Sequence, residues 1–218
     1  MRIVVHRLGR GANPSCISKI KPRAKPAAVV TSANPLLQGN AQPDHWLFAQ
    51  YAGCNVDAAV RKAAGPDLET AVKPLTCPVG SAVSTFSFDL KTFDFIVHTC
   101  TPKRGTNRWR SLLSSAVSST VAVAIEHGAK SLVLPALGCG VQQLSPREAA
   151  PIILNAAVET ARRDTAEGVA KDEDKRRHFQ LDYLEIAVWD RDTLISAFCN
   201  AAGELVAVER GRATLCVV

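Results

Sequence analysis

Four short apolar runs, separated by segments with helical spacing, constrain the fold of this chain more than any other feature of its sequence. The runs occupy residues 27–34, 94–102, 131–137 and 183–190. Between them, apolar residues recur with the helical period at about 109–127 and 146–163. Strands that alternate with helices form a sheet whose two faces the helices cover. The sequence therefore predicts an α/β fold.

Three further segments concern the edges of this sheet. Residues 2–8, RIVVHRL, have strand composition and are expected to form a first strand at one edge. Residues 80–88, GSAVSTFSF, interrupt the alternation and predict an extra strand, which makes the sheet mixed rather than wholly parallel. The tail from Glu204 onward, ELVAVERGRATLCVV, either adds a final strand or packs over an edge.

The composition limits the class of protein. A chain of 218 residues can bury a full hydrophobic core as one domain, and no apolar run is long enough to cross a bilayer. No secretory hydrophobic segment is visible either. The seven cysteines are scattered and form no Cys-x-x-Cys pair, which argues against a zinc ribbon and a disulfide framework. We therefore expect an intracellular protein of a reducing compartment, without a metal site.

The net charge of +6 is concentrated near the start of the chain, where seven basic residues precede the first acidic residue, Asp44. Such a stretch is typical of an organelle transit peptide, of a face that binds nucleic acid or another polyanion, or of a solvated basic edge. Because residues 2–8 are expected to belong to the sheet, we favour the solvated edge. A transit peptide, and with it a mitochondrial location, is the second interpretation.

The stretch VLPALGCGVQQLSPREAA, residues 133–150, runs from an apolar strand through a turn into the start of a helix. Ser145 and Pro146 are typical of the first positions of a helix. Gly138 and Gly140 lack the Cβ atoms that would keep main-chain N–H groups away from an anion. An ordinary turn between a strand and a helix also favours glycine, so the stretch alone leaves both interpretations open.

Two other segments are expected to be loops. Residues 38–52 interleave Gly, Pro, Asn and Asp with aromatic residues, which is typical of a binding loop or a packed insertion. Residues 165–182 are dense in charge and predict an exposed loop. After the first of these loops, the stretch VDAAVRKAAGPDL, residues 56–68, predicts a compact alanine-rich helix. Gly65-Pro66 is expected to stop this helix.

Five separated stretches resemble the successive motifs of the macrodomain family, the module that binds ADP-ribose. They are VVTSAN, NVDAAVRKAAGP, CPVGSA, FIVHTCTP and LVLPALGCGV, in the family's order. The resemblance covers roughly residues 3–195. It implies a three-layer α/β/α sandwich with a central mixed β-sheet, formed by residues 1–218 as a single macrodomain. It places the ligand cleft at the carboxyl ends of the central strands.

The resemblance also implies two catalytic residues, Asn34 and Asp57, beside the distal ribose. An asparagine can hold a ribose hydroxyl, and a carboxylate can orient or deprotonate a water beside the C1″ carbon. Each residue also has an ordinary structural interpretation. An asparagine before a proline is commonly a turn former, and an aspartate that opens a helix is commonly a first-turn charge.

The ligand contacts that the resemblance implies come from four parts of the chain. They are Thr31, Ala33, Asn34, Asn55, Val56, Asp57, Arg61, Ala136, Gly138, Cys139, Gly140, Val141, Gln142 and Trp189. Residues 138–141 match the loop that cradles the diphosphate. Trp189 falls where the family often has an aromatic that stacks on the base, although a tryptophan at this place can equally close the core.

Several positions depart from the family's motifs inside the same cleft. Thr31 and Ser32 stand where the family usually has Asn-Ala, and Cys54-Asn55 replace two glycines. Arg61 takes a position often held by histidine. It could face the diphosphate or a substrate carboxylate as a cation, but we favour a solvated helix arginine.

The two ends of the expected ligand raise further questions. Gln142 replaces an aromatic that usually covers the distal ribose, and we hypothesise that loop 38–52, with its three aromatics, supplies the missing cover. At the purine end, no acidic residue precedes Asp44, so the aspartate that usually binds adenine is missing. Asn13 is a possible substitute, because its carbonyl oxygen could accept a hydrogen bond from the amine.

The favoured function is hydrolysis of an ester-type linkage at C1″ of ADP-ribose, as in mono-ADP-ribosyl-protein hydrolases or O-acetyl-ADP-ribose deacetylases. The expected partner is ADP-ribose or an ADP-ribosylated protein, and no cofactor is required. The alternatives are a non-catalytic ADP-ribose reader and a basic RNA-binding or polyanion-binding module. His98 and Cys100 lie in the middle of a predicted strand and are more typical of the core than of a nucleophilic pair.

Overall fold

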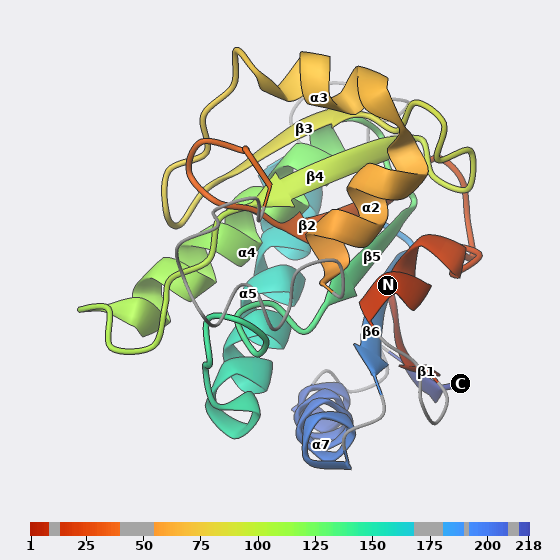
Figure 1. The fold of residues 1–218 in the computed structure, drawn as a ribbon. Helices are drawn as coiled ribbons and strands as arrows, with labels where there is room; N and C mark the ends of the chain where they lie inside the picture. The colour runs from red at the N-terminus through yellow and green to blue at the C-terminus, as the bar shows by residue number, and fades with distance from the viewer. Residues whose placement is uncertain (9–13, 40–54, 168–180, 190–191, 209–213) are drawn as a thin grey trace.

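The computed structural model describes residues 1–8, 14–39, 55–167, 181–189, 192–208 and 214–218 (Figure 1). Within these residues, seven strands form one sheet in the order β3-β4-β2-β5-β6-β1-β7. The strands are β1 (Arg2–Leu8), β2 (Ala27–Ser32), β3 (Ala82–Phe86), β4 (Phe95–Thr99), β5 (Ser131–Pro135), β6 (Tyr183–Trp189) and β7 (Thr214–Val217). β3 runs antiparallel to β4, and the other neighbouring pairs are parallel. The sheet is therefore mixed, as predicted.

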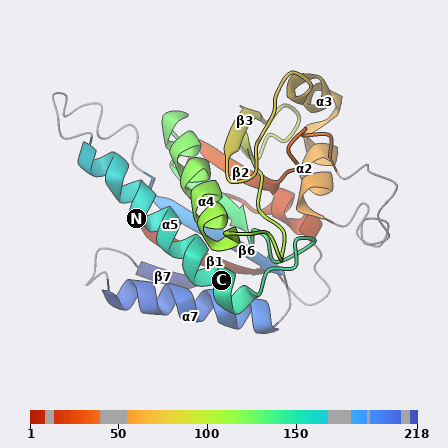
Figure 2. The same ribbon diagram turned by 90° about the vertical axis from the view of Figure 1, so that its left-hand side faces the viewer.

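Helices cover both faces of the sheet (Figures 1 and 2). The helices are η1 (Pro14–Lys19), α2 (Val56–Ala64), α3 (Pro66–Val72), α4 (Trp109–Glu126), α5 (Pro146–Glu167) and α7 (Asp192–Val208). In β2, Ala28 and Val30 join the buried cluster of α4, α5 and α7, whereas Ala27 and Val29 join that of η1, α2 and α3. Alternate side chains of a strand point to opposite faces, so a fully apolar strand is buried on both. The predicted three-layer α/β/α sandwich is confirmed.

The edge of the sheet differs from the prediction for residues 2–8. β1 lies between β6 and β7, because β7 pairs with it in parallel from Arg2 to Val5. The tail thus adds a final strand, which was one of its two expected roles. Its first residues, however, belong to α7, which the sequence analysis did not predict.

The stop of α2 at Gly65 is as predicted, but a second helix after it and the end of α5 differ from the predictions. Gly65 has a φ of +81° and ends α2, but Pro66 then serves as the first residue of a second helix, α3. The segment 165–182 is not one exposed loop, since α5 continues to Glu167 and Leu181 is 3% exposed. Residues 168–180 lie outside the described part of the chain.

His98 and Cys100 belong to the buried core at the end of β4. The His98 Nε2 atom lies 3.0 Å from Thr85 Oγ1, and its Nδ1 atom has no hydrogen-bond partner among the described residues. Burial raises the pKa of the Cys100 thiol to about 11. A thiol this weakly acidic is a poor nucleophile, so the structure supports the core interpretation of both residues.

His98 makes the stability of the fold depend on pH. Burial, with a smaller contribution from the Arg61 charge, lowers the pKa of His98 to about 4, below its ordinary value of 6.5. The unfolded chain therefore takes up a proton near pH 6.5, whereas the folded ring stays neutral until about pH 4. Stability from this group is complete above pH 6.5 and is lost as the pH falls toward 4.

We expect His98 alone to lower the free energy of unfolding by about 2 kcal/mol between pH 7.5 and pH 5. Urea unfolding at the two pH values measures this loss. In His98→Gln, the same drop in pH should reduce stability by about 2 kcal/mol less. An equal loss in both proteins would show that the ring does not stay neutral in the fold.

Candidate ligand-binding site at the carboxyl edge of the sheet

Four parallel neighbours, β4, β2, β5 and β6, end at the same edge of the sheet. This edge gathers residues 31–34 after β2, residues 136–142 after β5, and Trp189 at the end of β6. Helix α2, which carries Asp57 and Arg61, packs beside β2 (Figure 1). The topology therefore brings together the parts of the chain that the sequence analysis selected. In an open α/β sheet, ligands bind at this edge.

Asp57 lies in the first turn of α2 and is 2% exposed. Its Oδ1 atom accepts a hydrogen bond from Thr31 Oγ1 at 2.8 Å, and its Oδ2 atom accepts one from Arg61 Nε at 2.9 Å. Burial raises the pKa of Asp57, while Arg61 and Thr31 act in the opposite direction. Each oxygen keeps one further lone pair for another donor. The carboxylate is thus held in one orientation.

Arg61 is not a solvated helix arginine, since its side chain is 10% exposed. Besides bonding Asp57, it pairs with Glu69 through an Nη1–Oε1 distance of 2.7 Å and donates from Nη2 to the Leu37 carbonyl oxygen. The favoured expectation fails because Asp57 lies one helical turn before Arg61 and α3 brings Glu69 to the same guanidinium. All three guanidinium nitrogens serve protein partners. Arg61 therefore fastens α2 to the segment that follows β2.

Asn34 forms a local turn through its side chain. Its Nδ2 atom donates to the Gly39 carbonyl oxygen at 2.6 Å, and its Oδ1 atom accepts from the N–H groups of Leu36 and Gln38 at 3.1 and 3.3 Å. These contacts match the turn-forming interpretation. A contact with ribose remains a prediction.

The other predicted contacts near α2 are set by the start of the helix and the end of β2. Asn55 caps α2, because its Oδ1 atom accepts from the Ala58 N–H at 2.8 Å. Val56 is 7% and Ala33 6% exposed. These two can reach a ligand mainly through their backbone, and the Ala33 N–H already donates to the Thr99 carbonyl oxygen at 2.8 Å.

The two glycines of the loop after β5 have different roles. Gly138 has a φ of +75°, and a Cβ atom there would lie 2.5 Å from Leu144 Cδ1, so both the backbone and the packing require glycine. A Cβ atom on Gly140 would meet nothing within 4 Å. The packing of the fold therefore does not require glycine at position 140, and the space beside Gly140 is open.

Main-chain donors on this loop are free of protein acceptors. Within the described part of the chain, no hydrogen bond is made by the N–H groups of Gly138, Gly140, Val141 and Gln142. Unpaired amides that follow one another in a turn form a concave site for an anion. Burial raises the pKa of the Cys139 thiol in this loop to about 12, so Cys139 stays neutral and adds no charge against an anion.

Trp189 is half-buried and packs against the buried cluster beneath α4, α5 and α7, and Ala136 is 3% exposed. The packing of Trp189 agrees with its core-closing interpretation, whereas stacking on a base remains a prediction.

Three predictions fall outside the described residues. They concern Asn13, Cys54 and residues 40–52 of the aromatic loop. The expected cover for the distal ribose thus stays a hypothesis.

Comparison with known proteins identifies the family. The model of the Macro domain family matches residues 30–153. The chain belongs to the macro domain family. It is 32% identical over 143 residues to a macro domain-containing protein of Ralstonia nicotianae, covering 64% of this chain and 73% of the relative. It is 31% identical over 164 residues to a protein of Citrobacter rodentium named O-acetyl-ADP-ribose deacetylase, covering 70% and 85%.

Solved structures agree with this assignment of the fold. The Oceanobacillus iheyensis macrodomain with ADP superimposes with a TM-score of 0.65 at 20% identity, covering 88% of each chain. The Trypanosoma brucei macrodomain in complex with ADP-ribose gives a TM-score of 0.65 at 20% identity, covering 92% of this chain and 69% of that one. The three-layer sandwich described above is thus the macro domain fold.

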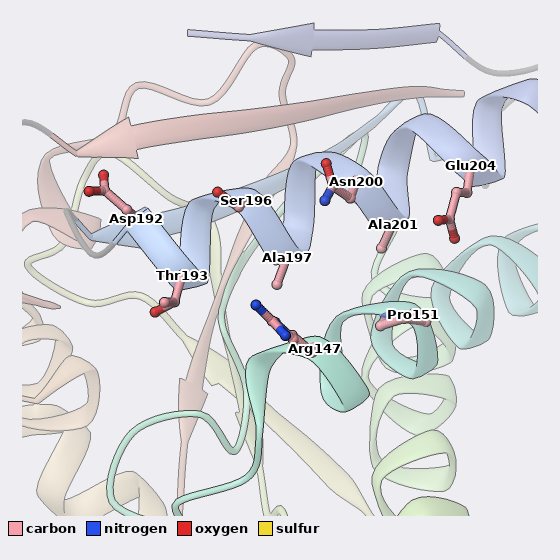
Figure 3. Close-up of a pocket in the computed structure, with 9 residues that line it drawn as sticks. All are labelled: Arg147, Pro151, Asp192, Thr193, Ser196, Ala197, Asn200, Ala201 and Glu204. Atoms are coloured by element: carbon pink, nitrogen blue, oxygen red, sulfur yellow. The ribbon is translucent and has the colours of Figure 1, made fainter.

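Two cavities of this macro domain lie outside the predicted contacts. The larger, about 500 Å³, lies between α5 and α7 (Figure 3). There Arg147 points from α5 toward α7, whose Thr193, Asn200 and Glu204 side chains line the facing wall. No signal for this cavity was found in the sequence, because α7 was not among the predicted helices.

The smaller cavity, about 260 Å³, lies between the loop after β4 and the start of α5. A signal for it is readable in the sequence as KRGTNRWR, residues 103–110, where four of eight residues are basic. The described residues contain no group of three His, Cys, Asp or Glu side chains that could hold a metal ion, and none of their helices is long and apolar enough to span a membrane.

Proposed function

We propose that this macro domain binds ADP-ribose and hydrolyses an ester-type bond at the C1″ carbon of the distal ribose. The observation that carries the binding proposal is the set of main-chain N–H groups at Gly138, Gly140, Val141 and Gln142, which have no partner among the described residues. Such amides favour a doubly charged diphosphate without any lysine. Relatives named O-acetyl-ADP-ribose deacetylase and a macrodomain solved with ADP-ribose support the choice of ligand.

Asp57 is the proposed general base. Its carboxylate is oriented by Thr31 and Arg61, and burial raises its pKa, which makes the carboxylate a stronger base. A water bound to a free lone pair of this carboxylate would attack C1″ and form the new C1″–O bond, and its proton would pass to Asp57. The bond from C1″ to the ester oxygen would break, and the acceptor would leave as a carboxylate. The diphosphate loop would fix the ribose for that attack.

A non-catalytic reader of ADP-ribose is the second candidate. It is favoured by the burial of Asp57, which is 2% exposed and already accepts one hydrogen bond on each oxygen. A reader would bind the ligand through the same loop but would release nothing from a modified protein.

Gly140→Val tests the binding proposal. The valine side chain fits the fold, because a Cβ atom at Gly140 meets nothing within 4 Å, but it would occupy the space above the free N–H groups. Titration calorimetry should show ADP-ribose binding weakened by at least ~10-fold, equivalent to about 1.4 kcal/mol. Gly203→Val is the matched control, since Gly203 is an exposed residue of α7 and also has open space around its Cβ position. Equal affinities of Gly140→Val and wild type would contradict the proposed site.

A further inference from the structure

The cavity of about 260 Å³ between the loop after β4 and the start of α5 adjoins the proposed diphosphate loop. Arg104 and Arg110 line one side, and Gln143 and Glu148 line the other. The Arg104 N–H donates to the Gln142 carbonyl oxygen at 2.8 Å, which ties the two loops together. The lining of the cavity therefore starts at Gln143, directly after Gln142 of the proposed diphosphate loop.

The cavity is lined by two arginines and one glutamate, and the segment that supplies both arginines is basic. Residues 103–110 contain four cations and no acid, and all four cations are exposed. The Arg104 side chain forms no hydrogen bond or ion pair with any residue that the structure describes. Arg110 lies over the Trp109 ring, 4.6 Å from its centroid, and pairs with the Glu148 carboxylate. The Arg104 guanidinium thus has no partner among the described residues. The Arg110 guanidinium is held by the exposed Glu148 carboxylate, which a carboxylate of a ligand could replace.

These contacts favour a carboxylate as the occupant. Glu148 already places a carboxylate oxygen against Nη2 of Arg110, and guanidinium groups pair well with carboxylates. Because Arg110 covers a face of the Trp109 ring, that face offers no stacking surface to a nucleobase. A cavity of about 260 Å³ suits one or two acidic side chains better than a further nucleotide.

The place of the cavity indicates where such a carboxylate comes from. The resemblance to the family puts Gln142 beside the distal ribose, and the C1″ carbon of that ribose carries the modified group. The main-chain N–H of Arg104 donates a hydrogen bond to the carbonyl oxygen of Gln142. We propose that this cavity binds acidic side chains that flank the modification site of an ADP-ribosylated polypeptide. This inference rests on the proposed function.

The test compares two mono-ADP-ribosylated peptides that differ only in their flanks. One carries glutamates beside the modified residue, and the other carries glutamines. By calorimetry, wild type should bind the acidic peptide ~5-fold more tightly, as expected for one or two exposed ion pairs. Arg104→Glu should reduce this ratio to about one. Glu148→Gln should raise it, because it frees Arg110.

Two controls separate this inference from the proposed function. Lys73→Glu makes the same charge reversal at an exposed site on the end of α3 and should keep the wild-type ratio. Free ADP-ribose should bind wild type and Arg104→Glu about equally. A wild-type ratio of one, or an unchanged ratio in Arg104→Glu, would overturn the inference. If no ADP-ribose compound binds, the proposed function fails, and binding of the unmodified acidic peptide then tests the cavity. Weak binding of this peptide that Arg104→Glu abolishes would support the inference. No binding of this peptide to wild type would overturn it.

Discussion

Asp57→Asn is expected to slow the release of ADP-ribose from a mono-ADP-ribosylated protein by about 100- to 10,000-fold, the usual contribution of a general base. Asparagine keeps the shape of the side chain and can still accept a hydrogen bond from Thr31, but it cannot take a proton from water. Single-turnover release assays on wild type and variant measure the effect.

The matched control for Asp57→Asn is Glu69→Gln. Glu69 is the other carboxylate that pairs with Arg61, but its side chain is 53% exposed and lies on α3. We expect Glu69→Gln to retain nearly full turnover. If Asp57→Asn binds ADP-ribose normally and still releases it at the wild-type rate, Asp57 is not the base. If wild type itself releases nothing but binds ADP-ribose, the protein is a reader.

The order of the central elements could be predicted from the sequence because each buried strand is a short apolar run. β2, with AAVVTS, is buried on both faces and is apolar at its first four positions. β7 carries no such signal, since three of its four residues are exposed. Its pairing with β1 depends on long-range packing, and for this reason residues 2–8 were expected at an edge that β7 occupies. Helix α7 was missed, although its small apolar residues face the core beside α5.

The candidate site shows a similar division. The spacing of Gly138 and Gly140 predicted a turn with bare amides, and in the described part of the chain the N–H groups of both glycines have no protein partner. Arg61 was misjudged because a single arginine on a helix looks solvated. Its spacing of four residues from Asp57 is visible in the sequence, but Glu69 and the Leu37 carbonyl oxygen reach it only through the fold.

Arg61→Met is expected to lower the free energy of unfolding by about 3–5 kcal/mol. Methionine fills much of the space of the arginine stem but leaves the Asp57 carboxylate buried without its cation. Removal of one partner of a buried ion pair is costly because the remaining charge has lost both water and its counterion. The Leu37 carbonyl oxygen also loses its side-chain donor. Urea unfolding at pH 7.5 measures the change.

The double variant Asp57→Asn/Arg61→Met separates the charge effect from simple loss of packing. Without the carboxylate, the methionine no longer leaves a buried charge unpaired, so the double variant should be more stable than Arg61→Met alone. The coupling energy of this double-mutant cycle should reach about 1–3 kcal/mol, as expected for residues in direct contact. Additive effects would mean that Arg61 acts through Glu69 and Leu37 and not through Asp57. In that case Arg61 would have no part in orienting the proposed base.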